Sequence, residues 1–213
     1  MIRVLGRQTS GNVQKVLFGL EEMGVAYVRE DYGRQFGNTQ TPEYRAMNPN
    51  AKVPTVLDGD LVIWESHTIL RYLATQHGAA LHGETPADRT EVERWMDWML
   101  ASVNTLYVAV FKDSKKEPGE RDAGFAAAGK ELAAQMAIAD AWLAGRGHFA
   151  LDRLTLADIA MAPIMARCLG FPIDREEMPN LERWMASMAE RPAFQVAVGQ
   201  KESALAGGGA AAQ

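Results

Sequence analysis

The chain of 213 residues has only one cysteine, Cys168. A single thiol can neither close an internal disulfide nor complete a Cys-x-x-Cys redox motif. Cys168 lies in the apolar segment IMARCLGF, so we expect it to be buried and chemically inert. The four histidines form no His-x-x-x-His pattern and no cluster at metal-ligand spacing. The sequence therefore predicts no dithiol chemistry and no metal site.

An excess of positive charge and a long hydrophobic run are also absent. The chain has 22 Lys and Arg against 27 Asp and Glu, a formal net charge of -5, and no run of basic residues. This balance argues against a nucleic-acid partner. No 18 consecutive residues are apolar, and the first residues, MIRVLGRQ, lack the apolar core of a signal peptide. We therefore expect a soluble, cytoplasmic protein that does not enter a membrane.

Strand and helix patterns organise the beginning of the chain. The segments MIRVLG and AYVREDY are β-prone, and a helix is predicted between them. Its apolar residues fall at spacings of three and four and share one face: Val13, Val16, Leu17, Leu20 and Met23. Gly24 ends this helix. A strand, helix and strand in this order imply that the two strands are parallel.

An antiparallel hairpin and a second helix follow. The segment VPTVLDGDLVIWES consists of two β-prone runs around Asp58-Gly59, a strong hairpin signal. A helix is then predicted from Ser66 to Gly78. Residues 33–52 read as a long loop with one short helix around TPEYRAM. Residues 1–78 are therefore predicted to form one α/β domain.

The rest of the chain is predicted to be helical. Residues 79–87 read as a linker, and a long helix of roughly 28 residues begins behind Thr85-Pro86, with no Gly or Pro inside it. Further helices fit Ala123–Leu143 and the segments TLADIAMAPIMARCLG and PNLERWMASMAERPAF. The prediction is an all-helical domain over residues 88–204 and a flexible tail over 205–213.

The turn before the first helix carries Ser10 and Asn12. Both are common N-cap residues, so either could simply bond the helix backbone. The first turn of a helix also presents unpartnered N–H groups and a positive dipole end, which suit an anion. This stretch alone leaves both interpretations open.

Two further segments could bind a ligand. Val53-Pro54 opens a predicted strand. If the peptide bond between them is cis, the N–H and C=O of Val53 turn outward and can pair with a ligand backbone. The alternative is an ordinary trans proline at the start of a strand. Glu65 and Ser66 stand where the next strand leads into a helix. Ser66 could cap that helix or help to hold an anion there, and Glu65 could accept from an ammonium group.

Taken together, these segments resemble the cytosolic glutathione transferases over roughly residues 1–200. The motifs that carry the resemblance are NPNAKVPTV, ESHTILRYLA and LTLADIAMAP. The resemblance implies a thioredoxin-like domain followed by an all-helical domain, with glutathione as co-substrate and no metal. It also implies a homodimer. The function it implies is detoxification, in which the glutathione thiolate attacks a small hydrophobic electrophile.

The resemblance assigns glutathione contacts to particular residues. Val53, followed by a cis Pro54, pairs its backbone with the cysteinyl part of glutathione. Glu65 and Ser66 hold the α-amino and α-carboxylate groups of the γ-glutamyl part. Lys52 is a candidate partner for the glycyl carboxylate, with a solvated lysine as the alternative. Gln40 is a weaker candidate for the same role.

The resemblance also proposes how the thiol is activated. A free thiol has a pKa near 8.5, so a donor at a helix N-terminus that lowers this value raises the thiolate fraction. Ser10 matches the catalytic serine of theta-like classes, and Asn12 matches the asparagine of nu-like classes; we rank Ser10 first. Thr9 adjoins them and is a candidate for the electrophile pocket. No tyrosine occupies this turn, so the mechanism of the alpha, mu and pi classes does not apply.

Aromatic residues recur on the predicted long helix. Trp95 and Trp98 are expected to pack in the core. Tyr107 and Phe111 lie late in this helix, where the family lines its electrophile pocket, and could serve either the pocket or the core. A separate motif, Thr155-x-x-Asp158, has the spacing of a capping box, and we interpret it as structural.

Two alternatives to conjugation remain. The same site could support glutathione-dependent reduction of disulfides or peroxides, which Asn12 makes credible. The chain could also be a binding or interaction protein without turnover, since a fold does not fix a function. The intact glutathione motifs argue against this last hypothesis.

Overall fold

The computed structural model describes residues 1–207, which form two compact units. The first consists of Met1–His82 together with Ala189–Gln213, of which residues 208–213 are not described. The second is Gly83–Met188. The α/β and all-helical fold class predicted from the sequence is confirmed.

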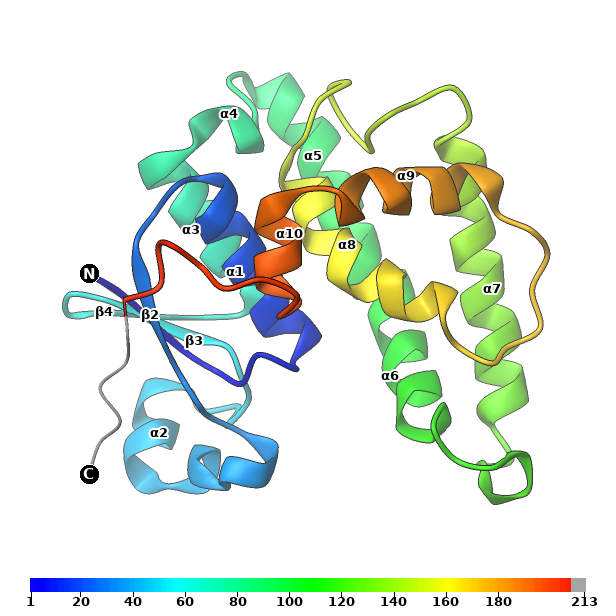
Figure 1. The fold of residues 1–213 in the computed structure, drawn as a ribbon, viewed down its shortest axis with the longest axis horizontal. Helices are drawn as coiled ribbons and strands as arrows, with labels where there is room; N and C mark the ends of the chain where they lie inside the picture. The colour runs from blue at the N-terminus through cyan, green and yellow to red at the C-terminus, as the bar shows by residue number, and fades with distance from the viewer. Residues whose placement is uncertain (208–213) are drawn as a thin grey trace. The chain divides into compact units, whose positions relative to one another are not determined.

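A four-stranded mixed sheet forms the centre of the first unit (Figure 1). Its strands are β1 (Ile2–Leu5), β2 (Tyr27–Glu30), β3 (Thr55–Asp58) and β4 (Leu61–Trp64), in the spatial order β2-β1-β3-β4. Strands β1 and β2 are parallel, whereas β3 pairs antiparallel with both β1 and β4. The predicted crossover and hairpin are thus both confirmed.

Two helices of the first unit pack against α1 (Gly11–Glu22). Its neighbours are α3 (Ser66–His77) and α10 (Pro192–Ala197). Val13, Val16, Leu17 and Leu20 of the predicted apolar face are buried, whereas Met23 is half-buried at the C-cap. Gln14 and Lys15 are buried as well, because α1 has neighbours on several sides. The remaining helical segments are η1 (Arg34–Phe36), η2 (Asn38–Gln40), α2 (Pro42–Met47) and α4 (Ala79–His82). Helix α4 lies within the predicted linker, which is therefore not extended.

The end of the chain belongs to the first unit, which corrects the predicted domain boundary. The expected helix over PNLERWMASMAERPAF is interrupted before Pro192, because proline lacks an N–H and the residue before it is extended. The guanidinium of Arg191 donates to both carboxylate oxygens of Glu22 on α1, at 2.6 and 2.9 Å. The ring of Phe194 meets that of Phe18 edge-on at 5.5 Å. These contacts attach α10 to α1.

The expected flexible tail is also corrected for its first residues. The N–H of Tyr27 donates to the carbonyl of Leu205, and the N–H of Gly207 donates to the carbonyl of Tyr27. Ala206 thereby forms a parallel bridge with Tyr27 on β2. Residues 205–207 are therefore held against the sheet edge, and residues 208–213 lie outside the described part of the chain.

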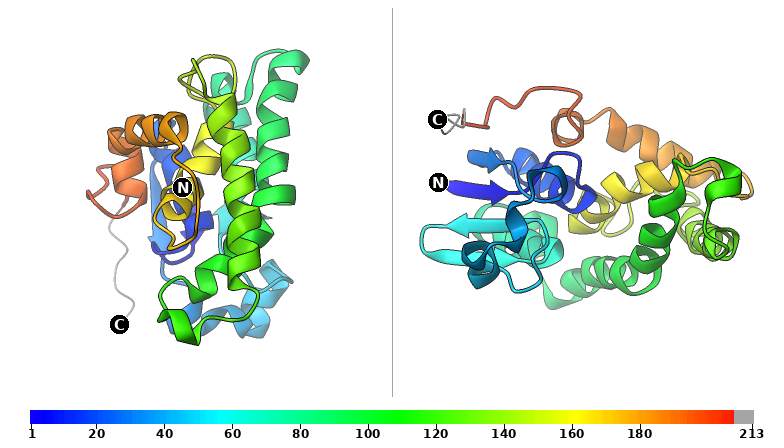
Figure 2. Two further views of the ribbon diagram at one scale, coloured as in Figure 1. Left: turned by 90° about the vertical axis from the view of Figure 1, so that its right-hand side faces the viewer. Right: turned by 90° about the horizontal axis from the view of Figure 1, so that it is seen from below.

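The second unit is helical. Its helices are α5 (Pro86–Trp98), α6 (Asn104–Asp113), α7 (Phe125–Trp142), α8 (Leu156–Leu169) and α9 (Pro179–Ala189), with a short turn η4 (Pro118–Glu120). Figure 2 shows α7 running alongside α6. The long helix expected behind Thr85 is not continuous, because a π-helical segment, η3 (Met99–Val103), separates α5 from α6. A π segment inserts an extra residue into a turn and needs no Gly or Pro, so the sequence carried no signal for it.

Asp158 is the polar centre of the second unit. Its carboxylate is fully buried and accepts from the N–H and hydroxyl of Thr155, at 3.0 and 3.2 Å. It also accepts from the N–H of Phe149 at 3.1 Å and from the indole N–H of Trp184 at 2.9 Å. The predicted capping box is confirmed, and its acid also ties the start of α8 to two neighbouring segments.

No helix within residues 1–207 is long and apolar enough to span a bilayer. Within the same residues, no three His, Cys, Asp or Glu side chains gather where they could hold a metal ion. Cys168 is buried as expected, and burial raises the pKa of its thiol to about 12.

Candidate functional site: the first helix and the loop beside it

Helix α1 begins with polar side chains that its own backbone does not use. Ser10 occupies the N-cap position, with φ -85° and ψ 124°, but its hydroxyl makes no capping hydrogen bond. Ser10 is 8% exposed, and the first turn that follows contains no acidic residue. The positive end of the helix is therefore not balanced by a carboxylate on the helix itself. Such an end is suited to an anion.

A cavity of about 370 Å³ lies at this end of α1. Its lining residues are Arg7, Ser10, Asn12, Gly33, Arg34, Thr39, Gln40, Ala51, Lys52 and Val53. Three segments separated in the sequence contribute to it, residues 7–12, 33–40 and 51–53, and three of the side chains are cationic. The cavity combines positive charge with hydroxyl and amide groups, as a peptide ligand that carries carboxylates requires.

The turn that carries Val53 is held from behind by two side chains. The hydroxyl of Tyr44 donates to the carbonyl of Lys52 at 2.7 Å, and the amide of Asn48 donates to the same carbonyl at 2.9 Å. Both side chains also reach the hydroxyl of Thr55, at 2.8 and 3.1 Å. This network fixes the backbone on both sides of Val53.

The peptide bond between Val53 and Pro54 is cis, as the family resemblance implied. The backbone hydrogen bonds between described residues do not use the N–H or C=O of Val53. Those two groups can therefore pair with a ligand backbone, in the manner of a strand added to a sheet edge.

Helix α3 starts in a similar way to α1. Glu65 precedes it in an unusual backbone conformation, with φ 69°, and makes no side-chain capping bond. Ser66 is 4% exposed, whereas Glu65 is open to solvent. The first turn of α3 again contains no acidic residue. This helix start offers N–H groups, a hydroxyl and a carboxylate at one place.

A buried amine lies behind these residues. The ammonium nitrogen of Lys15, on α1, is 3.1 Å from Nε2 of His67, on α3, and the lysine is fully buried. Burial lowers the pKa of Lys15 to about 7, while the nearby carboxylate of Glu65 acts to raise it. The pair therefore connects α1 to the residue that follows Ser66.

Comparison with known proteins identifies the family of the chain. Residues 3–75 match the family model for the glutathione S-transferase N-terminal domain, and residues 103–192 match that for the C-terminal domain. Glutathione S-transferase GstB of Escherichia coli K12 is 39% identical over 203 residues, covering 93% of this chain and 98% of that protein. The chain belongs to the glutathione S-transferase family. Glutathione S-transferase 4 of Zea mays is 30% identical, with 90% of this chain and 89% of that protein covered.

A solved structure agrees with this result. The theta class glutathione S-transferase of Xanthomonas axonopodis pv. citri, with glutathione bound, superposes with a TM-score of 0.88 at 41% identity, covering 96% of this chain and 98% of that one. The present protein is accordingly a glutathione transferase, an enzyme with glutathione as its co-substrate.

The glutathione S-transferase cavity unites most of the first-unit residues singled out from the sequence. Those that line it are Ser10, Asn12, Gln40, Lys52 and Val53. Pro54, Glu65 and Ser66 are not among its lining residues but belong to the same unit. Thr9 is exposed and does not line the cavity either. Gln40 is also held by the guanidinium of Arg45, to which its side-chain oxygen is hydrogen-bonded.

Five cavity residues of this transferase were not anticipated: Arg7, Gly33, Arg34, Thr39 and Ala51. Arg7 lies two residues after the end of β1. A β-carbon added at Gly33 would come within 2.9 Å of the Arg7 guanidinium. Gly33 has φ 84°, so the turn before Arg34 needs glycine for both its conformation and its closeness to Arg7. In the sequence, Gly33 in the segment DYGRQFG was the available sign of a tight turn at this point.

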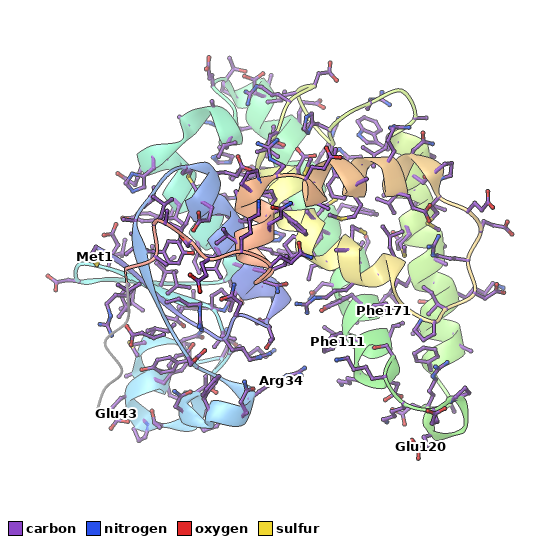
Figure 3. All side chains as sticks on the ribbon, viewed as in Figure 1. Met1, Arg34, Glu43, Phe111, Glu120 and Phe171 are labelled. Atoms are coloured by element: carbon purple, nitrogen blue, oxygen red, sulfur yellow. The ribbon has the colours of Figure 1, made fainter. Side chains whose placement is uncertain are left out.

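The predicted electrophile residues of the second unit lie in one aromatic cluster. The ring centroid of Tyr107 is 5.6 Å from that of Phe111 and 5.9 Å from that of Phe171, which was not predicted. Figure 3 shows Phe111 and Phe171 side by side. Trp95 packs in the core as expected, 8% exposed, and Trp98 is half-buried beside it.

Proposed function

We propose that glutathione binds in the cavity at the start of α1 with its sulfur beside Ser10 and Asn12. The observation that supports this most strongly is the serine hydroxyl, which occupies a helix N-cap without capping the helix. A hydroxyl donor and a helix dipole both stabilise a thiolate more than a thiol. They would lower the pKa of the bound thiol and raise the fraction of nucleophile at neutral pH.

The rest of glutathione is assigned to the residues around this point. The Val53 backbone pairs with the cysteinyl backbone, since its N–H and C=O are unused by the described residues. Glu65 and Ser66 hold the γ-glutamyl ammonium and carboxylate groups, and Pro54 shapes the turn between these contacts. Lys52, with Gln40 beside it, attracts the glycyl carboxylate. Arg7 and Arg34 add positive charge to the same cavity.

The reaction is then a nucleophilic attack of the thiolate on a small hydrophobic electrophile. Tyr107 and Phe111 are the residues that we assign to the electrophile. Thr9 receives a weaker assignment, because it is exposed and does not line the cavity.

The ultraviolet absorbance of the thiolate, followed against pH with glutathione bound, tests this proposal. We expect the native protein to hold the thiol pKa well below the free value. We expect Ser10→Ala to return it towards that value, and Asn12→Ala to have the smaller effect. Thr9→Ala is the matched control, since it removes an adjacent hydroxyl outside the cavity. If the native protein binds glutathione without shifting the thiol pKa, thiol activation at this site is rejected.

Asn12 supports a second candidate function, glutathione-dependent reduction of disulfides or peroxides, because its amide lines the same cavity. Parallel assays with two substrates, a haloarene and a mixed disulfide that contains glutathione, distinguish conjugation from reduction. Conjugation predicts turnover of the haloarene that depends mainly on Ser10. Reduction predicts turnover of the mixed disulfide that depends mainly on Asn12.

We further propose that the protein acts in the cytoplasm as a homodimer. A glutathione thiol stays reduced in the cytosol. Strand β4 is a sheet edge, and the side chains of Leu61, Val62 and Trp64 are 48%, 37% and 37% exposed. Exposed apolar side chains on an edge strand favour a partner surface. Light scattering of Val62→Glu should then report a monomer where the native protein gives a dimer.

A further inference from the structure

Thr39 is a buried polar residue whose hydroxyl the fold does not use. It lies in η2, is 7% exposed and lines the cavity at the start of α1. Its hydroxyl makes no hydrogen bond to another described residue. Its oxygen is not sealed off from solvent, so it is open to the cavity. Such a hydroxyl needs a partner, because leaving a buried polar group unpaired costs free energy.

The loop that leads to Thr39 is closed by the side chain of Asn38. Its Oδ1 accepts from the N–H of Gly33, and its Nδ2 donates to the carbonyl of Asp31, both at 3.0 Å. The amide of Asn38 therefore joins the two ends of residues 31–38. Because Thr39 directly follows this closed loop, its hydroxyl is held in position before a ligand arrives, and less ordering is needed on binding.

Thr39 also lies beside the residues that we assign to the glycyl end of glutathione. Gln40 follows it in the chain, and Lys52 lines the same cavity. The glycyl carboxylate has two oxygens and accepts several hydrogen bonds, so one cation does not satisfy it alone. A hydrogen bond from a hydroxyl to an ionised acceptor is stronger than one between neutral groups. The γ-glutamyl groups are assigned to the start of α3, whose residues do not line this cavity.

Resting on the proposed function, we propose that Thr39 and Asn38 select thiol peptides that end in a glycyl carboxylate. The hydroxyl of Thr39 donates to that carboxylate and adds to the attraction of Lys52. Asn38 is a positioning residue, because it holds the loop that places Thr39. Thr39 is thus a specificity-determining residue for the peptide, and a dipeptide without the glycyl residue does not reach its hydroxyl.

Calorimetry with two ligands that cannot react tests this proposal. S-Methylglutathione has the glycyl residue, whereas the carboxylate of γ-glutamyl-S-methylcysteine ends the chain one residue earlier. Thr39→Val is nearly isosteric and removes the hydroxyl. We expect it to weaken S-methylglutathione binding about tenfold and to leave dipeptide binding within about twofold. Thr39→Ser keeps a hydroxyl and should restore most of the affinity.

Thr75→Val is the matched control, because it removes an exposed hydroxyl that bonds the Arg71 carbonyl on α3 and does not line the cavity. It should change neither affinity. The thermal unfolding of Thr39→Val should match that of the native protein, since the hydroxyl bonds no other described residue. Equal losses for both ligands, no loss for either, or the same loss in Thr75→Val would overturn the assignment of Thr39.

The role of Asn38 is tested by a double-mutant cycle. Asn38→Ala should weaken S-methylglutathione binding severalfold and leave dipeptide binding unchanged. If Asn38 acts through Thr39, the variant with both substitutions binds S-methylglutathione no more weakly than Thr39→Val alone. Additive losses, or a loss that is equal for the two ligands, would overturn the positioning role.

The thiol absorbance measured against pH separates this inference from the proposed function. A lowered thiol pKa, together with a preference for the tripeptide that depends on Thr39, supports both proposals. A lowered thiol pKa with a preference that Thr39→Val leaves unchanged overturns the role of Thr39 and leaves thiol activation standing. A preference that depends on Thr39 without any change in the thiol pKa supports the glycyl subsite and counts against the proposed chemistry.

Discussion

Helix α1 follows Ser10 and helix α8 follows Thr155, and both residues have the extended backbone conformation of an N-cap. At α8 the hydroxyl and N–H of Thr155 donate to the buried carboxylate of Asp158, in the first turn of the helix. At α1 the first turn holds no acid, and the serine hydroxyl makes no capping bond. The polar groups at one helix start are consumed by the fold, and those at the other are left for a ligand.

The same contrast separates other helix starts. Thr41 and Thr85 each accept a hydrogen bond from a backbone N–H of α2 and α5, and an acidic residue stands in the first turn of each helix. Helix α3, which begins behind Glu65, has neither a side-chain cap nor an acidic first turn. A side-chain cap and an acidic first turn satisfy backbone N–H groups and balance the helix dipole, whereas the starts of α1 and α3 keep an unbalanced positive end. Helices α7 and α10 also lack a side-chain cap and an acidic first turn, so an uncapped start indicates a binding site only where it lines a cavity, as Ser10 does.

The largest expected effect comes from removing the acid that completes the α8 start. Asp158→Ala deletes the acceptor of four buried hydrogen bonds and leaves their donors unsatisfied. We expect a loss of about 3–5 kcal/mol in the free energy of unfolding, measured in urea. Asp88→Ala, at the exposed capping box of α5, is the matched control and should cost clearly less. Equal losses at the two boxes would contradict the central role of Asp158.

At the α1 start, activity and stability should respond separately. Ser10→Ala should lower kcat/KM for a haloarene about 100-fold or more, as loss of a donor to a reacting anion does. The free energy of unfolding should change by less than about 0.5 kcal/mol, because the hydroxyl makes no capping bond. Steady-state kinetics and urea unfolding of the same preparation measure both. A stability loss near 1 kcal/mol with full activity would make Ser10 an ordinary cap.

The buried amine behind the site should make stability depend on pH. Lys15 has a pKa of about 7 in the folded chain and 10.5 when unfolded, so between these values the unfolded state binds more protons. Stability should therefore rise with pH across this window, and the full penalty of burying the charge should apply below pH 7.

Lys15→Met should remove that rise. The difference in unfolding free energy between native and variant protein should change by about 3 kcal/mol from pH 7 to pH 9.5. Urea unfolding at several pH values measures it, and taking the difference cancels other titrating groups. Lys52→Met is the control, since Lys52 is exposed. A constant difference would mean that Lys15 keeps its charge throughout.

The smallest effect is expected at the turn that carries Val53. Tyr44→Phe removes the hydroxyl that bonds the Lys52 carbonyl and Thr55, and should cost about 1 kcal/mol of stability. It should also raise the KM for glutathione with little change in kcat, because the turn positions a binding group. Tyr72→Phe, which removes a hydroxyl bonded to Asp58 in the same unit, should leave the KM unchanged. A KM equally affected by both changes would exclude a specific role for Tyr44.

Local patterns in the sequence predicted much of the fold. The spacing of Val13, Val16 and Leu17 gave the buried face of α1, Asp58-Gly59 gave the hairpin, and Thr155-x-x-Asp158 gave the start of α8. Each of these signals concerns residues within one turn or one hairpin, where backbone geometry dictates residue type. Local patterns also singled out Val53-Pro54 and Glu65-Ser66 as possible ligand contacts, and the resemblance to a family assigned their roles.

Contacts between distant segments were beyond such patterns. The sequence could not show that α10 packs on α1, that Lys15 is buried against His67, or that Arg7 and Arg34 line one cavity. These facts depend on which elements the folded chain brings together.

The sequence by itself thus determined most of the elements, the family and a short set of polar residues at helix starts. Only the tertiary structure decided which of those residues the fold uses and which it leaves available. A hydroxyl at an N-cap has the same local propensity whether or not it makes a capping bond. The difference lies in the surroundings that the rest of the chain gives each helix start. Thr155 is hydrogen-bonded to the buried Asp158, whereas Ser10 lines a cavity.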